Sequence, residues 1–477
     1  MGRKQKNIVL EKLLVEDYAA EGKSLARLDG KVIFIEGVVP GDVVDVRLGR
    51  NKKDWAEGKP VKFHSYSATR VPPFCQHFGS CGGCQWQMLP YEQQLKYKER
   101  QVRDNLQRIG KVPLPELMPI AGAPETTYYR NKIEYTFGNK RYLTRAELDM
   151  PDVSAQQDVA GFHARGLFDK IVDIETCYLQ AEPTNGIRLA IRDFARANGY
   201  TFYDIREHAG LLRTMQIRLC TSGEIMVNIV FGENDVEKRE AILRHVDALF
   251  PEITTLLYTI NLKRNDSIHD LEPIAWKGKG YVNEYLYPAG AAGPLVFKIG
   301  PKSFFQTNTR QGEQLYRITA EYAELTGRET VYDLYCGTGS IGIFVSNHAK
   351  KIVGVEVIDA AIADAKENAA LNGLQEAAFF AGDVIEICND EFFAAHGRPD
   401  VIITDPPRAG MHEKLVRKIL DMEAPVVVYV SCNPATQARD LGLLAEKYDV
   451  TRIQPVDMFP HTLHIENVVQ LKLKRTV

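Results

Sequence analysis

The chain has 477 residues, of which 45% are hydrophobic and 25% charged, and its formal net charge is −3. A chain of this length exceeds a single hydrophobic core, so we expect roughly two to four domains. The composition excludes a disordered or fibrous protein, and no apolar run approaches the ~20 residues that span a bilayer. The N-terminus lacks the apolar stretch of a signal peptide, so we expect a cytoplasmic protein without membrane contact.

Residues 1–67 are predicted to form a small all-β unit. Apolar runs at 24–28 and 32–35 are separated by Asp29-Gly30, which is a strong hairpin signal. Short strands with a turn about every ten residues favour a small barrel. A modest basic patch in this unit is compatible with phosphate contacts. Its lysines are Lys52, Lys53, Lys59 and Lys62.

Residues 91–109 are predicted to form an amphipathic helix that ends at Gly110, because apolar residues recur on one face. The other face is basic and either is solvated or meets RNA. Its basic residues are Lys96, Lys98, Arg100, Arg103 and Arg108. Further along, strands and helices mix up to about residue 300, including a hairpin of residues 215–219 and 225–230.

From about residue 330 the pattern changes to strands that alternate with helices. Five compact apolar runs lie at residues 331–334, 352–356, 378–380, 401–404 and 426–431. Helical segments separate them, which predicts a doubly wound parallel α/β sheet. Ligands of such sheets bind at the carboxyl ends of the strands, so residues that follow these runs are candidate site residues.

A glycine-containing turn follows the first of these runs, in the sequence DLYCGTGS of residues 333–340. Glycines there let the backbone approach a ligand closely at a helix N-terminus. Glu356 ends the next run and can bond ribose hydroxyls, and Asp383 after the third can contact an adenine amino group. The turn is not GxGxxG and no phosphate-binding lysine follows, which favours S-adenosylmethionine over a dinucleotide or a nucleoside triphosphate.

The fourth run leads into Asp405-Pro406-Pro407-Arg408. This segment resembles the Asp/Asn-Pro-Pro motif of methyltransferases that act on planar bases. Enzymes of that kind that methylate amino groups usually carry an aromatic residue after the prolines. Arg408 therefore counts against amino-directed methylation of nucleic acid, which stays as an alternative.

Cys432 ends the fifth run, where a ligand of the sheet would bind. A cysteine at such a place is suited to methylation of uracil, whose carbon 5 is too weak a nucleophile by itself. Addition of a thiolate at carbon 6 activates carbon 5, and a base must later remove the proton from carbon 5. Glu466 is the base that we favour, and His464 is the alternative.

Three cysteines lie within ten residues of one another, and the chain has eight cysteines in all. Cytoplasmic thiols are normally reduced, so we do not expect disulfides. Cys75, Cys81 and Cys84 form the cluster, and Cys177 is predicted to be its fourth member. Four thiolates suit zinc or an iron–sulfur cluster, and the spacing barely separates these alternatives. The remaining cysteines, apart from Cys432, are expected to be core residues or cofactor neighbours: Cys220, Cys336 and Cys388.

Five segments in order resemble the RNA (uracil-5-)-methyltransferase family, and the resemblance extends from about residue 301 to the C-terminus. They are FFQTN at 304–308, DLYCGTGSIG at 333–342, DPPR at 405–408, SCNP at 431–434 and PHTLHIENV at 460–468. The resemblance implies that Cys432 is the nucleophile and Glu466 the base. It also implies six cofactor-binding positions. They are Gln306, Tyr335, Ser340, Glu356, Asp383 and Asp405, with Ser340 standing where relatives often have asparagine.

One branch of this family has the same cysteine spacing and carries a 4Fe–4S cluster behind an N-terminal TRAM barrel, which implies iron–sulfur with zinc as the alternative. We therefore expect a multidomain α/β protein. Its parts are an OB-like TRAM barrel at 1–67, a mixed α+β central domain with the cysteine cluster at 68–90 and 126–300, and a Rossmann-like methyltransferase domain at 91–125 and 301–477.

The expected activity is methylation of carbon 5 of a uridine in RNA by a monomeric enzyme that uses S-adenosylmethionine. The branch resemblance favours 23S ribosomal RNA as the substrate, and transfer RNA is the alternative. A non-enzymatic iron–sulfur protein that binds RNA is a rival from another class. The intact cofactor and nucleophile motifs speak against that rival.

Overall fold

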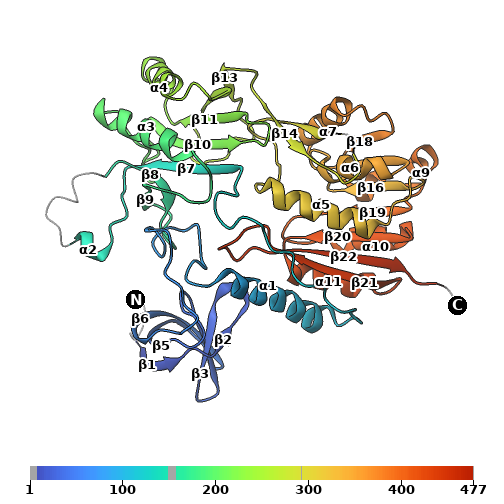
Figure 1. Cartoon of the computed structure of the whole chain (residues 1–477), viewed down its shortest axis with the longest axis horizontal. Helices are drawn as coiled ribbons and strands as arrows, with labels where there is room; N and C mark the ends of the chain where they lie inside the picture. The colour runs from blue at the N-terminus through green and yellow to red at the C-terminus, as the bar shows by residue number, and fades with distance from the viewer. Residues whose placement is uncertain (1–7, 149–156, 292, 476–477) are drawn as a thin grey trace.

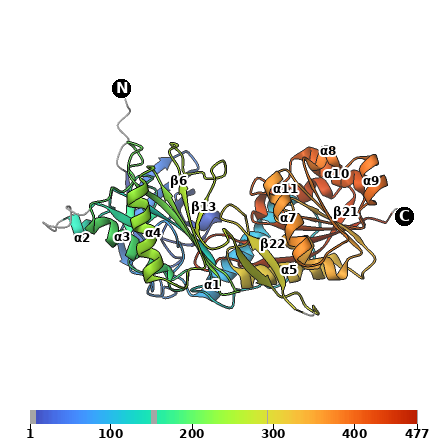
Figure 2. The same cartoon turned by 90° about the horizontal axis from the view of Figure 1, so that it is seen from above.

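The computed structural model describes residues 8–148, 157–291 and 293–475. Residues 1–7, with which the predicted barrel begins, and residues 149–156 of the predicted central domain lie outside this description. Three sheet-containing units follow one another along the chain, coloured blue, green and orange to red (Figures 1 and 2). Within the described ranges, no helix is both long and apolar enough to cross a membrane.

The N-terminal unit is a six-stranded sheet with the order β1-β5-β6-β4-β3-β2. The predicted hairpin is confirmed, because β3 and β4 pair antiparallel around Asp29 and Gly30, which both have positive φ. Small aliphatic residues on the inner face form its own core, including Ile33, Val44 and Val46. The strands are β1 Val9–Leu14, β2 Asp17–Tyr18, β3 Ser24–Leu28, β4 Lys31–Ile35, β5 Val43–Asn51 and β6 Trp55–Ser65.

A closed barrel, as the sequence predicts for this unit, is not found among the described residues. The edge strands of the sheet are β1 and β2, and no hydrogen-bonded ladder joins them. Strand β2 has only two residues and is followed directly by the 3-10 turn Ala20–Gly22, so it is too short to offer a partner strand a full row of backbone groups. The unit is therefore a sheet wrapped around its own core, in which one N-terminal segment supplies both edge strands, because only Val15 and Glu16 separate β1 from β2.

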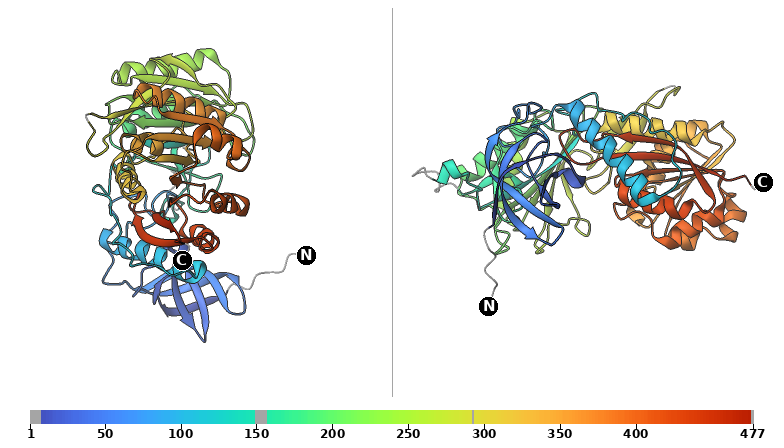
Figure 3. Two further views of the ribbon diagram at one scale, coloured as in Figure 1. Left: turned by 90° about the vertical axis from the view of Figure 1, so that its right-hand side faces the viewer. Right: turned by 90° about the horizontal axis from the view of Figure 1, so that it is seen from below.

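Helix α1, Tyr91–Asn105, lies between the N-terminal sheet and the C-terminal domain (Figure 3). The helical conformation continues as a π turn through Gly110, which matches the predicted end of the helix. Arg100 on one side donates to Asp17 of the N-terminal sheet, while the other side packs against β21 and α11. The predicted basic outer face is wrong for one residue, because the Lys98 side chain is fully buried in a contact with the C-terminal domain.

The central unit is a seven-stranded sheet with the order β13-β12-β11-β10-β7-β8-β9. The predicted hairpin is confirmed as β10 and β11, and two helices, α3 and α4, cover one face of the sheet (Figure 1). The elements are β7 Lys132–Gly138, α2 Arg145–Leu148, β8 Val159–His163, β9 Ile171–Asp173, α3 Thr184–Ala197, β10 Leu212–Leu219, β11 Ile225–Phe231, α4 Val236–Leu249, β12 Thr255–Ile260 and β13 Ile274–Lys277.

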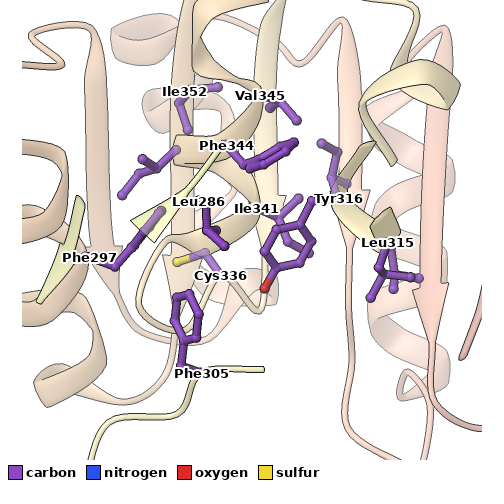
Figure 4. Close-up of a cluster of buried hydrophobic side chains, with 14 of the residues drawn as sticks. Leu286, Phe297, Phe305, Leu315, Tyr316, Cys336, Ile341, Phe344, Val345 and Ile352 are labelled. Carbon is purple, nitrogen blue, oxygen red and sulfur yellow. The ribbon is translucent and has the colours of Figure 1, made fainter. Parts of the chain in front are cut away.

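A two-stranded ribbon, β14 Val282–Leu286 and β15 Leu295–Ile299, links the central unit to the C-terminal domain. Its apolar side chains join a core shared with helices α5 and α6, in which Phe297 and Phe305 lie near Cys336 (Figure 4). Cys336 is therefore a buried packing residue directly behind the glycine-containing turn. Cys388 is likewise buried, in the core on the other side of the C-terminal sheet.

The C-terminal domain is built on a seven-stranded sheet with the order β18-β17-β16-β19-β20-β22-β21. Its first five strands are parallel, as predicted, and β22 is antiparallel to both β20 and β21. The strands are β16 Thr330–Leu334, β17 Lys351–Glu356, β18 Ala377–Ala381, β19 Val401–Thr404, β20 Val426–Ser431, β21 Tyr448–Val456 and β22 Glu466–Leu473. The helices are α5 Thr309–Ala323, α6 Ser340–Val345, α7 Asp359–Leu371, α8 Val384–Ile387, α9 Asp390–His396, α10 Glu413–Met422 and α11 Pro434–Leu444, with the short 3-10 turn η3 Ser346–His348.

The strand order of this sheet reverses between β16 and β19, which are neighbours although two strands, β17 and β18, separate them along the chain. Open α/β sheets bind ligands at such a switch point, outside the carboxyl ends of the strands. All the site residues that the sequence predicts after β16 to β20 therefore lie along one edge of the domain.

Candidate active site

The turn after β16 has the backbone conformation of a ligand-binding loop. Tyr335, Gly337 and Gly339 all have positive φ, at 61°, 53° and 78°. A Cβ atom on Gly339 would lie 3.0 Å from the Phe379 ring, so a larger residue would have to displace that ring. The turn therefore needs glycine at this point and delivers its backbone directly to the N-terminus of α6.

Glu356 at the end of β17 is tied to the same turn. Its Oε2 accepts a hydrogen bond from the Gly337 backbone N–H at 3.3 Å, and its Oε1 accepts from the Ile358 N–H at 3.1 Å. The carboxylate is almost fully buried, and these contacts fix its position beside the turn. Glu356 thus lies at the carboxyl end of β17, and its contact with a ribose stays a prediction.

Three other predicted cofactor residues lie at the same edge of the domain and differ in their exposure and hydrogen-bond partners. Asp383 is exposed and one of its oxygens caps α8 by accepting from the Ile385 N–H at 2.8 Å. Gln306 is buried just before α5. The Ser340 hydroxyl is 2.9 Å from the Tyr316 hydroxyl, so it already has a partner inside the protein.

Two aspartates at the switch point have unusually high proton affinity. Burial raises the pKa of Asp405, which follows β19, to about 7. Burial also raises the pKa of Asp333 on β16 to about 7, against the opposing effect of the Gly342 N–H that donates to it at 2.8 Å. Carboxyl groups so perturbed cluster at functional sites, because desolvation there serves binding or proton transfer.

Cys432 and Glu466 face the same site from adjacent strands. Ser431, the last residue of β20, pairs with Asn467, the second residue of β22. Cys432 follows β20 directly and therefore lies close to Glu466, the first residue of β22, whose charge acts on it. Burial, with the negative charges of Glu466 and Asp405, raises the pKa of the Cys432 thiol to about 11. Burial and Asp405 likewise raise the pKa of Glu466 well above its usual value.

Arg408 is the positive charge of this site. Its guanidinium donates to His464 Nδ1 at 2.6 Å and lowers the pKa values of both Cys432 and Glu466, against the stronger effect of their burial. Burial and Arg408 lower the pKa of His464 to about 4, so this histidine is neutral at physiological pH. His464 therefore holds Arg408 in place rather than carrying a charge itself.

The four cysteines of the predicted cluster line one cavity of about 320 Å³ between the 75–87 segment and the central sheet. Burial raises the pKa of Cys81 to about 12 and that of Cys84 to about 11, and each thiol is affected by the charge of its neighbours. Cys177 closes the cavity from a loop fixed by the Asn185 side chain, which accepts from its backbone N–H at 2.9 Å. The structure thus places around one cavity residues that are about a hundred positions apart, and their binding of a common metal or cluster stays a prediction.

The four cysteines line one cavity, but their side chains do not form a metal site. Within the described ranges, no group of three or more histidine, cysteine or acidic side chains is arranged to hold a metal ion. Cys220, expected in a core, is half-buried in a different cavity near Tyr128 and Arg310.

Several residues of the site escape sequence reasoning. From the sequence, Arg408 indicates only that the aromatic residue of amino-directed methyltransferases is absent, whereas its contact with His464 joins parts of the chain that are 56 positions apart. Lys98 and Asp457 form a buried ion pair with an N–O distance of 2.6 Å immediately before the loop that carries His464. A usable signal existed for Lys98, because it shares a helix face with Tyr91 and Gln94 at intervals of three and four residues.

Comparisons with known proteins agree with this geometry. The family model of tRNA (uracil-5-)-methyltransferases matches residues 274–474. An RNA methyltransferase of Bacteroides thetaiotaomicron, itself described as uncharacterized, is 51% identical, with 96% of this chain and all of the relative covered. A similarly described protein of Chlorobaculum tepidum is 39% identical over 98% of this chain and 96% of its own.

A solved structure extends the likeness to the whole fold. The tRNA (uracil-54, C5)-methyltransferase of Pyrococcus abyssi, in complex with S-adenosyl-L-homocysteine, superposes with a TM-score of 0.74 and 27% identity, covering 96% of this chain and all of that one. The glycine-containing turn, the Asp-Pro-Pro-Arg segment and the paired Cys432 and Glu466 thus occur in a chain that resembles such enzymes from end to end. This protein belongs to the RNA (uracil-5-)-methyltransferase family and is an S-adenosylmethionine-dependent RNA methyltransferase.

Proposed function

We propose that this enzyme methylates carbon 5 of a uridine in RNA, with Cys432 as the nucleophile and Glu466 as the base. The observation that carries the proposal is that Cys432, directly after β20, and Glu466, the first residue of β22, lie close together at the same end of two paired strands. A thiol and a carboxylate on adjacent strands can act on adjacent atoms of one flat base, one at carbon 6 and the other at carbon 5.

The bond changes balance around these two side chains. Cys432 loses its proton to solvent, and its sulfur adds to carbon 6, so that the π electrons of the carbon 5–carbon 6 bond form an enolate. Carbon 5 then takes the methyl group of the sulfonium, whose carbon–sulfur electron pair stays on the departing S-adenosylhomocysteine. Glu466 removes the proton from carbon 5, the double bond re-forms, and the carbon 6–sulfur bond breaks to release the thiolate.

Arg408 supports the first of these steps. The pKa of Cys432 in the free enzyme is far above neutrality, so the thiol needs a nearby positive charge to ionise. Arg408 is the group at the site that acts in this direction, and its contact with neutral His464 holds it there. Because His464 already serves as an acceptor for Arg408, it is less suited than Glu466 to take the proton from carbon 5.

The proposed cofactor contacts are made by residues at the carboxyl ends of the strands and by Gln306 before α5. Glu356 is proposed to bind the ribose hydroxyls, Asp383 the adenine, and Gln306, Tyr335 and Asp405 the methionine end of S-adenosylmethionine. Ser340 is a weaker candidate than the sequence suggests. Its hydroxyl is bonded to Tyr316, so contact with the cofactor would require that bond to be shared or broken.

The cysteine cavity is proposed to hold a 4Fe–4S cluster, with zinc as the alternative. Cys75, Cys81, Cys84 and Cys177 surround one cavity, and four soft thiolates are the donor set that such groups use. Arg130 and Lys132 also line the cavity and would offset the negative charge of a cluster bound by four thiolates. The group would tie the 75–84 segment to the central sheet.

The RNA target is proposed to be 23S ribosomal RNA, with transfer RNA as the second candidate. The N-terminal sheet is proposed to be a TRAM-like RNA-binding unit, and its lysines on and before β6 are exposed, as phosphate contacts require. Those residues are Lys52, Lys53, Lys59 and Lys62. Transfer RNA stays a candidate because the Pyrococcus abyssi relative is a tRNA enzyme.

RNA that contains 5-fluorouracil should form an adduct with this protein that survives denaturation. Fluorine at carbon 5 cannot leave as a proton, so the carbon 6–sulfur bond stays intact after methyl transfer. Gel electrophoresis under denaturing conditions with labelled RNA measures the adduct. We expect none with Cys432→Ser and an unchanged amount with the buried control Cys388→Ser. Absence of an adduct with RNA that the enzyme does methylate would refute the covalent mechanism.

Alkylation of Cys432 in the free enzyme should speed up about tenfold per pH unit from pH 7 towards its pKa of about 11, because only the thiolate reacts. Arg408→Gln removes the positive charge and should slow the reaction at any one pH in this range. Glu466→Gln removes a negative charge and should accelerate it. Mass spectrometry of the peptide containing Cys432 gives the rates. A plateau already near pH 7 would contradict a raised thiol pKa.

Protein purified without oxygen should contain iron and sulfide and absorb broadly in the blue region, if the cavity holds an iron–sulfur cluster. Cys177→Ser should reduce bound iron, because it removes one of four ligands, whereas Cys388→Ser should not. Metal and sulfide analysis measures both. A colourless protein with one zinc ion per chain would contradict the iron–sulfur cluster and support zinc, the alternative.

A purified sample should transfer labelled methyl groups to 23S ribosomal RNA transcripts and not to transfer RNA transcripts. Mapping of 5-methyluridine in both RNA classes from a strain that lacks the gene tests the same point in cells. Loss of the modification from transfer RNA alone would move the substrate to the second candidate and leave the proposed chemistry intact.

A further inference from the structure

The loop of residues 457–465 carries the proposed base. It connects β21 to β22, and its two ends are fixed to each other because Val456 pairs with Glu466 in the ladder between these strands. Glu466 is therefore the first residue after the loop, and Asp457 is the residue next to its cross-strand partner. Asp457 follows Val456, the residue that pairs with Glu466, so a contact that fixes Asp457 also restricts the position of Glu466.

Helix α1 is bonded to the start of this loop through a buried ion pair. Lys98 Nζ lies 2.6 Å from Asp457 Oδ1 and donates to the Phe459 carbonyl at 3.2 Å, and both charged side chains are fully buried. The Tyr91 hydroxyl donates to the other Asp457 oxygen at 2.9 Å. Because an unpaired buried charge is costly, Asp457 has a strong preference for the one position in which it meets Lys98.

The same helix face also holds the middle of the loop. Gln94 accepts from the His461 backbone N–H at 2.9 Å, and its amide nitrogen lies 3.0 Å from His461 Nδ1. His461 has a positive φ of 63°, a conformation that a residue other than glycine adopts only when its surroundings impose it. Gln94 is buried, so these contacts are shielded from water.

Two further segments of the N-terminal part touch the loop. The backbone N–H groups of Gln85 and Trp86, directly after the clustered cysteines, donate to the His461 carbonyl at 2.8 and 3.1 Å. Gly22 of the N-terminal sheet lies against Leu463, so closely that a Cβ on Gly22 would meet the leucine side chain at 2.0 Å. The loop is thus enclosed by α1, the cysteine-rich segment and the N-terminal sheet together.

The nucleophile is held by different parts of the protein. Cys432 follows β20, and the turn after it is fixed by Asn433, whose Oδ1 accepts from the Ala435 N–H at 3.1 Å to cap α11. The Ser431 hydroxyl accepts from the Asn433 N–H at 3.1 Å. None of these bonds involves α1, so a disturbance of the Lys98–Asp457 pair leaves the local anchors of Cys432 in place.

We propose that the Lys98–Asp457 pair and Gln94 are positioning residues that hold the 457–465 loop so that Glu466 reaches the proton on carbon 5. The inference rests on the proposed role of Glu466. This role predicts a selective effect on the late steps of the reaction. Loss of the contacts between α1 and the loop impairs removal of the proton and release of the product, while attack by Cys432 and methyl transfer continue.

Single-turnover reactions with labelled S-adenosylmethionine and 23S ribosomal RNA transcripts test this, with transfer RNA transcripts in their place if those prove to be the substrate. Two quantities are followed: methyl groups transferred to RNA, and methylated RNA still attached to the denatured protein. For Lys98→Met we expect methyl transfer within about threefold of the wild type but release slowed by about 10²-fold, as a misplaced catalytic group implies. Glu466→Gln provides the reference for a trapped adduct, and Lys98→Arg should restore most of the release rate.

The matched control is Glu92→Gln, on the same helix but exposed and outside its basic face, which should leave both rates unchanged. Gln94→Met loosens the loop at His461 without leaving a buried charge, so it tests the proposal even if Lys98→Met fails to fold. Equal loss of both steps in Gln94→Met, or release at the wild-type rate, would overturn the positioning role. If Glu466→Gln traps RNA and the helix variants do not, the positioning role fails alone; if Glu466→Gln traps none, the proposed function of Glu466 fails first.

Discussion

The active site depends on the antiparallel pairing of β20 with β22 at the edge of an otherwise parallel sheet. Parallel strands alone deliver side chains from their carboxyl ends, which accounts for the glycine-containing turn, Glu356, Asp405 and Cys432. Strand β22 runs the other way, so its first residue arrives at the same edge. Strand β22 begins at the end of the sheet where the parallel strands finish. Its first residue, Glu466, therefore lies close to Cys432, which follows β20.

The electrostatics of this edge favour a resting enzyme in which the thiol is protonated. Asp333, Asp405 and Glu466 are buried, and the charge of Asp405 raises the pKa values of both Asp333 and Glu466. Asp405 and Glu466 also oppose ionisation of Cys432. Arg408 is the opposing charge. Burial and these charges therefore hold the partly buried Cys432 thiol in its protonated form in the free enzyme.

How far the sequence predicts this site depends on whether the signal is local. The β3–β4 hairpin, the parallel strands and the place of Cys432 all follow from short patterns, and the structure has them. Closure of the N-terminal barrel is not reported by such a pattern, because the two edge strands, β1 and β2, follow each other after only two residues and two-residue β2 offers too little to pair with. Lys98 was expected on a solvated or RNA-facing side because helix periodicity shows only that one face is polar. Its partner Asp457 lies 359 residues away, and no local pattern reports such a contact.

These long-range contacts also decide what the N-terminal third of the chain does for the C-terminal domain. A parallel sheet can position its own strand ends, but the loop between β21 and β22 has no regular structure and needs support from outside. Its backbone polar groups at His461 are satisfied by Gln85, Trp86 and Gln94, and its buried acid by Lys98. Without those partners the loop would expose unpaired polar groups and a charge to an apolar surrounding, which costs free energy in proportion to their burial. The C-terminal domain is therefore incomplete as a separate folding unit, and the segments that precede it are part of the structure that holds the loop before Glu466.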